Sequence, residues 1–162
     1  MCRLLIAVAT IAIAYPGPAC GQDFDAMTLQ GLSQLYVVVE GVPEEPELEQ
    51  TLQTIVELRM REAGIDVIAA EEGYDSPSSA YVYVNANLLH VEKIDHYVYS
   101  LEISVSQAVT LARSGFWHAG ATTWDTEMIG IIPDDDMDTD IRDTADLLMD
   151  RFLNAYLSVN PR

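Results

Sequence analysis

Hydrophobic and polar residues alternate along the middle of this chain in a pattern that predicts paired β-strands. Apolar residues recur at every second position within Ala80–Val91 and Tyr97–Ala112, and a short polar connection separates the two stretches. A period of two predicts strands with one apolar and one polar face, here joined as a hairpin. Residues 35–40 and 65–70 are also rich in β-forming residues. A further strand is expected from Phe116 through Trp124, with an irregular continuation past Gly130 to Ile132.

Two other segments follow the helical period of about 3.6 residues. One is expected over residues 46–63, and the other begins in the Asp-rich run 134–140 and ends before Asn160. The predicted order is β-α-β-β-β-β-α. A helix between the first two strands implies a right-handed crossover, whereas the later strands favour an antiparallel meander. We therefore expect an α/β (α+β) fold with a mixed, mostly antiparallel sheet and two helices packed on one face.

The register of the hairpin decides which side chains share a face. Both apolar sets face the same side if paired residue numbers have an odd sum, which a two- or four-residue turn gives, and we take that sum as 187. A three-residue turn at 113–115 then aligns the next strand, with Trp117, Ala119 and Ala121 on the core face. We call the polar side the open face, and its predicted members are Tyr81, Tyr83, Asn85, Glu102, Ser104, Thr122 and Trp124.

The open face has two interpretations at this point. An antiparallel sheet covered by helices on one side commonly leaves its other side solvated. Aromatic rings interleaved with amides and hydroxyls are also typical of recognition surfaces. The sequence leaves both interpretations open, and it makes this face the candidate binding surface.

The first 21 residues have the pattern of a secretory signal peptide. Arg3 precedes the apolar run 4–14, and the small residues Ala19 and Gly21 suit cleavage before residue 22. Lipid attachment at Cys20 is an alternative. We therefore expect a periplasmic or secreted protein with a lead-in segment over 22–34 and one globular domain over 35–160. Because Cys2 and Cys20 are the two cysteines, thiol chemistry is excluded from the processed chain.

Composition and charge narrow the classes of partner. The chain has 162 residues, 49% of them hydrophobic, which suits one globular domain. Its formal charge of −18 argues against nucleic acid and against anionic membrane surfaces. No apolar segment is long enough to predict a membrane span in the processed chain. An envelope or secreted protein is the expected partner, and the oligomeric state is left open.

The sequence offers no catalytic constellation. Nucleophilic catalysis needs a base within reach of a hydroxyl, and the three imidazoles are His90, His96 and His118. His118 is expected far along the sheet from Glu102, while His90 and His96 flank one turn on opposite faces. No catalytic motif or phosphate-binding loop is present, so we expect no catalytic residues and no cofactor.

The Asp-rich run provides the candidates for metal binding. Asp134, Asp136 and Asp138 match the opening of a calcium loop. Thr139 then stands where such a loop needs glycine, and Ala145 stands where it needs the closing acid. The alternative is a set of acids that stabilises a helix N-terminus.

Several short motifs together resemble small exported bacterial proteins of unknown function. They are Leu35–Val39, Tyr81–Asn85, Gln107–Arg113, Thr123–Trp124, Phe152–Leu157 and Asn160–Pro161. The element order is also similar to the amino-terminal domain of the Tol-Pal propeller protein and to small outer-membrane assembly lipoproteins, an analogy of topology alone. The resemblance implies export and this architecture, and it implies no site.

Together these observations predict an exported, non-enzymatic binding or scaffold domain of the bacterial cell envelope. One alternative is a periplasmic protein that binds a small molecule or a cation such as calcium. A hydrolase is the third possibility, and it would require a cleft that brings a histidine to a carboxylate.

Overall fold

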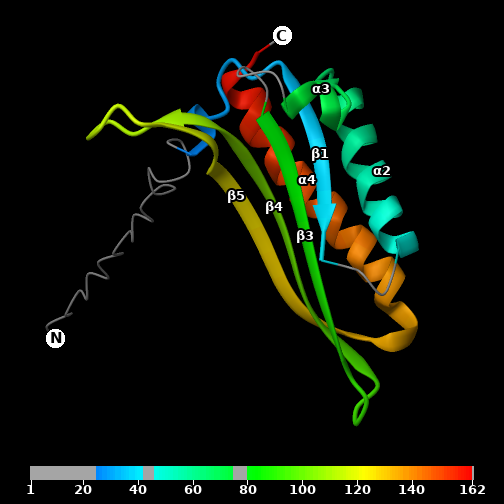
Figure 1. Ribbon diagram of the computed structural model, residues 1–162. Helices are drawn as coiled ribbons and strands as arrows, with labels where there is room; N and C mark the ends of the chain where they lie inside the picture. The colour runs from blue at the N-terminus through cyan, green and yellow to red at the C-terminus, as the bar shows by residue number, and fades with distance from the viewer. Residues whose placement is uncertain (1–24, 42–45, 75–79, 162) are drawn as a thin grey trace, which may run out of the picture.

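The computed structural model describes residues 25–41, 46–74 and 80–161 (Figure 1). The expected export signal and the first residues of the lead-in segment lie outside this part of the chain. Within it, a sheet forms one layer and two long helices form the other.

The sheet has five strands in the order β2-β1-β3-β4-β5. The strands are β1 (Gln34–Glu40), β2 (Asp66–Val67), β3 (Ala80–Val91), β4 (His96–Thr110) and β5 (Trp117–Pro133). β1 pairs in parallel with both β2 and β3, whereas β3, β4 and β5 are antiparallel. The expected mixed sheet is therefore confirmed.

Helices α2 (Pro46–Glu62) and α4 (Met137–Val159) pack side by side on one face of the sheet. Their buried residues join the strands in one core, in which Phe152 is fully buried. A short 3₁₀ helix, η1 (Asp134–Asp136), leads from β5 directly into α4. Burial of each large apolar side chain in such a core contributes roughly 1.5–3 kcal/mol.

A third helix, α3 (Ala70–Tyr74), was not expected from the turn-rich sequence. It lies against Tyr36, whose side chain points to the face opposite the core and is nevertheless only 5% exposed. A Cβ atom at position 73 would lie 2.1 Å from the Tyr36 ring, so this contact requires Gly73. α3 therefore covers the β1 end of the open face.

The hairpin of β3 and β4 has the predicted register. Tyr83 pairs with Ser104 and Asn85 pairs with Glu102, and the turn occupies residues 92–95. Asp95 adopts a φ of 54° in this turn, a left-handed conformation that Asp tolerates better than most residues. The alternation of apolar and polar residues restricts the pairing to odd sums, and the four-residue turn at 92–95 accompanies the sum of 187.

The predicted position of Trp124 on the open face is wrong. Ser106 pairs with Thr122 as expected, but Val105 pairs with Trp124, so Thr123 is an extra residue in β5. A bulge of one residue exchanges the two faces for every later side chain. Trp124 therefore points into the core, where it is 7% exposed and its ring centroid lies 5.5 Å from that of Phe152.

Residues of the lead-in segment hold this bulge in place. The Thr28 hydroxyl lies 2.9 Å from the Thr123 carbonyl and 2.6 Å from the Asp25 carbonyl, so the two carbonyls share its single hydrogen. The Gln107 amide donates to the Thr28 carbonyl at 2.9 Å and to the Thr123 hydroxyl at 2.7 Å. The lead-in therefore satisfies backbone groups that the bulge removes from the ladder.

A second irregularity follows between Gln107 and Val109, and it also changes the expected faces. Trp117 is 55% exposed and Ala119 is exposed, so their expected placement in the core is wrong. Ala121 is half-buried opposite Gln107. None of the helices in the described ranges combines the length and apolarity needed to cross a bilayer.

The two tryptophans provide a matched test of this register. We expect Trp124→Ala to lower the free energy of unfolding by about 3–5 kcal/mol, because it leaves a cavity against Phe152. Trp117→Ala should change it by no more than about 0.5 kcal/mol. Urea denaturation followed by far-ultraviolet circular dichroism measures both. Equal losses for the two variants would contradict the bulged register.

Candidate functional site

The structure brings most of the predicted binding residues together on the open face. Four of them are half-buried and one is exposed: Tyr81, Tyr83, Asn85, Glu102 and Thr122. Ser104 lies among them but is only 2% exposed, so a partner cannot reach much of its side chain. Trp124 is on the other side of the sheet, as described above.

Tyrosines occupy the part of the open face nearest α3. The ring centroids of Tyr36 and Tyr81 are 5.5 Å apart. The Tyr83 hydroxyl donates a hydrogen bond of 2.7 Å to Oε2 of Glu40. This bond, together with burial and the negative charges of Glu40 and Glu102, raises the pKa of Tyr83 to about 12. Tyr83 is therefore a neutral, fixed hydroxyl near pH 7.

Acidic residues form the next level across the open face. Glu40, Asn85, Glu102 and Glu127 are consecutive partners in β1, β3, β4 and β5, and we call them the acidic row. Glu102 and Glu127 stand directly opposite each other, which is unfavourable for like charges. The Lys and Arg residues that the structure describes lie on α2, on α4 and in the two hairpin turns. The acidic row is thus not neutralised by a cation on its own face.

An exposed apolar surface lies beyond the acidic row. Leu89, Val98 and Ile131 are consecutive cross-strand partners, and Ile129 precedes Ile131 on the same side of β5. We call these four residues the apolar band. They are 65%, 37%, 57% and 68% exposed in that order. Single exposed apolar residues are ordinary on protein surfaces, but a contiguous group marks an interaction surface.

Part of the apolar band could have been found from the sequence. The residue-number sum of 187 already places Leu89 opposite Val98. Ile129 and Ile131 were missed because the strand was expected to become irregular near Gly130. The structure keeps β5 regular there, and a Cβ atom at Gly130 would lie 2.5 Å from the Tyr99 ring. This glycine therefore marks a close approach of a side chain rather than the end of the strand.

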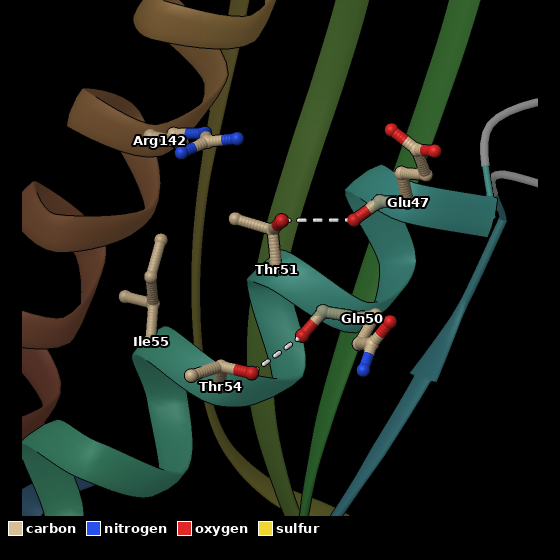
Figure 2. A pocket seen from close by; sticks show the side chains of 6 residues that line it. All are labelled: Glu47, Gln50, Thr51, Thr54, Ile55 and Arg142. Atoms are coloured by element: carbon tan, nitrogen blue, oxygen red, sulfur yellow. Dashed lines mark hydrogen bonds between the residues drawn. The ribbon is translucent and has the colours of Figure 1, made fainter.

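A shallow groove lies between α2 and α4 on the described surface (Figure 2). Its lining residues are Glu47, Gln50, Thr51, Thr54, Ile55 and Arg142. The Thr51 and Thr54 hydroxyls donate to carbonyls one turn earlier in α2, each at 2.8 Å. Both hydroxyls therefore have their donor hydrogen-bonded within their own helix.

The metal candidates of the Asp-rich run are separated by the helical start. Asp134 and Asp136 lie in η1, whereas Asp138 lies in the first turn of α4. Within the described residues, one group of potential ligands is close enough to hold a metal ion, and it joins Asp134 to His90 and Asp95. Asp136 and Asp138 lie outside that group. His90 and Asp95 were not predicted as partners of Asp134, because β3, the hairpin turn and η1 each supply one member of the group.

Acidic residues farther along α4 have a structural role. Asp146 and Asp150 form ion pairs with Arg59 of α2. Because these pairs are partly exposed, each contributes no more than about 1 kcal/mol. They bridge the outer edges of the two helices.

Comparison with known proteins finds no family model that matches the chain and no curated protein with significant sequence similarity to it. The functional assignment therefore depends on the geometry of the open face and on the expected export signal.

The bond between Tyr83 and Glu40 gives an expected pH dependence. Because the pKa of Tyr83 is raised from 10 to about 12, this bond stabilises the folded protein fully below about pH 10. The stabilisation is lost as the pH rises through about 12. Absorbance of tyrosinate near pH 12 should show a step that is missing in Tyr83→Phe. Glu40→Gln should move that step toward lower pH. Circular dichroism at each pH checks that the chain is still folded, and an unchanged step in Glu40→Gln would contradict the assignment.

Proposed function

We propose that this protein is an exported, non-enzymatic binding domain of the bacterial cell envelope, and that the open face of its sheet binds another protein. The observation that carries the proposal is the apolar band beside the acidic row. The signal-peptide pattern of residues 1–21 supports a periplasmic or secreted location. Lipid attachment at Cys20 would place the same domain at a membrane surface.

The apolar band is the part of the face that gains most from a partner. Leu89, Ile129 and Ile131 each leave more than half of their surface in water. Full burial of an aliphatic side chain of this size is worth roughly 1.5–3 kcal/mol. A partner that covers the band recovers part of that free energy. Their common position, on neighbouring strands and on one side of the sheet, allows a single partner to cover them.

The acidic row indicates what kind of partner fits. Along the strands the acidic row lies two residues from the apolar band in β5 and four residues from it in β3 and β4, at about 7 Å for each two-residue step. An anionic lipid surface would be repelled by these charges. A protein segment with apolar side chains and flanking Lys or Arg residues complements both features.

The edge of the sheet favours an extended segment of that partner. β5 lies at the end of the strand order, and in the described part of the chain it pairs only with β4. A strand added to β5 would gain backbone hydrogen bonds. It would also continue the open face, so its apolar residues would lie beside Ile129 and Ile131 and its cations beside Glu127. This arrangement uses both the edge and the face.

Site-specific photo-cross-linking in cells tests the proposal. The full-length chain is expressed with benzoylphenylalanine at position 129 and, as a matched control, at Leu147, an exposed position of α4. We expect a discrete protein adduct from position 129 and none from position 147. Glu102→Gln combined with Glu127→Gln should weaken the adduct, because two exposed ion pairs contribute roughly 0.4–2 kcal/mol together.

No adduct from position 129, or the same adducts from both positions, would overturn the proposed function. An adduct that is insensitive to the two Glu→Gln changes would overturn the cationic character of the partner.

Serine substitutions in the apolar band provide a second test. Ile129→Ser combined with Ile131→Ser should leave the free energy of unfolding within about 1 kcal/mol of wild type, since both side chains are exposed. With benzoylphenylalanine placed at position 89, the double variant should lose the protein adduct that the otherwise wild-type chain forms from that position. The control is Leu58→Ser combined with Leu147→Ser, which changes two exposed leucines of the helices (52% and 44% exposed). Equal loss of the cross-link in the control would contradict the assignment to the band.

A further inference from the structure

We propose that His90, Asp95 and Asp134 form a binding site for a divalent transition-metal ion of the zinc class. This inference is independent of the proposed binding function, because none of the three residues belongs to the open face, the acidic row or the apolar band. Neither the sequence pattern of the Asp-rich run nor the open face requires it.

The three ligand atoms already lie near the spacing that a metal ion requires. Nε2 of His90 is 3.5 Å from Oδ1 of Asp95 and 3.8 Å from Oδ1 of Asp134. One nitrogen and two carboxylate oxygens all lie within 4.8 Å of one another. Tetrahedral bonds of about 2.0–2.2 Å place ligand atoms roughly 3.3–3.6 Å apart. Small rotations of exposed side chains are therefore sufficient to close the site.

The backbone holds the three residues at one end of the molecule. His90 lies next to the last residue of β3, Asp95 closes the hairpin turn, and Asp134 begins η1. The Asp134 amide donates to the Asp95 carbonyl at 3.1 Å, which ties the turn to η1. The ring of His90 lies against Tyr97, with centroids 4.8 Å apart. The backbone thus places the three side chains beside one another before a metal ion binds.

The charge of the neighbourhood favours a cation. Two carboxylates flank one imidazole, and Asp135 and Asp136 follow directly in η1. Protonation of His90 would also balance part of this charge and would produce an ordinary ion pair. The two possibilities differ in what occupies Nε2, because a metal ligand must be an unprotonated ring nitrogen. The experiment below distinguishes them at that atom.

The donor set selects the class of metal. Calcium and magnesium prefer ligand shells of oxygen, whereas imidazole together with carboxylate suits zinc and its neighbours in the first transition row. Three protein ligands leave a fourth tetrahedral position for water or for a ligand from outside. The residues also differ from the calcium loop suggested by Asp134, Asp136 and Asp138, since two of those three are not in the group.

Calorimetry and nuclear magnetic resonance with Zn²⁺ test the site. The protein is produced from the full-length chain and purified with a tag that lacks histidine. We expect one equivalent of Zn²⁺ to bind at neutral pH and to shift the ¹⁵N resonance of His90 Nε2. His90→Gln and Asp134→Asn should each weaken binding at least about tenfold, because even residues outside the ligand shell cost 10–100-fold when lost.

Matched controls separate this site from general attraction to acidic residues. Asp138→Asn removes an equally exposed carboxylate of the same run, and His118→Gln removes an exposed imidazole elsewhere. Both should leave the affinity unchanged, while urea denaturation verifies that every variant is folded. The proposal is overturned if wild type does not bind Zn²⁺, if Asp138→Asn weakens binding as much as Asp134→Asn, or if His90 Nε2 stays protonated in excess Zn²⁺.

Discussion

The packing of α2 and α4 against one face of the sheet is the constraint on which the other features depend. It requires the strands to present Val82, Val84, Leu101 and Ile103 to one side, so the alternating residues must occupy the other. Both long helices use the same side, so the far side retains only α3 as cover. The open face follows directly from this division, since the chain has no third long helix among its described elements.

Local periodicity predicted the fold well where neighbouring residues alone decide the structure. The range expected for the first helix, 46–63, compares with Pro46–Glu62 in the structure, and the hairpin register was correct throughout. The predicted faces of Trp124 and Trp117 were wrong, because β5 contains extra residues relative to β4. A bulge at Thr123 is stabilised by Thr28, which lies far away in sequence. Alternation within a strand carries no information about such a distant contact.

The candidate site was predictable to a similar degree. The polar members of the open face were found, because the register that pairs Asn85 with Glu102 depends on the hairpin alone. Ile129 and Ile131 of the apolar band were missed because an irregular continuation was expected past Gly130, whereas β5 stays paired with β4 up to Pro133. Likewise, His90 and Asp134 meet only after β5 has returned to the hairpin turn. Both features depend on tertiary structure.

The lead-in segment has a consequence for the order of folding. Within this segment, the Leu32 carbonyl accepts a hydrogen bond of 2.6 Å from the Tyr156 hydroxyl. The Asn160 side chain donates to the Leu29 carbonyl and accepts from the Gly31 amide. A chain made from its N-terminus therefore produces these residues early, but their partners emerge last. Contacts of such long sequence separation form slowly. The segment that contacts the bulge through Thr28 can thus be anchored to Tyr156 and Asn160 only after nearly the whole chain has been made.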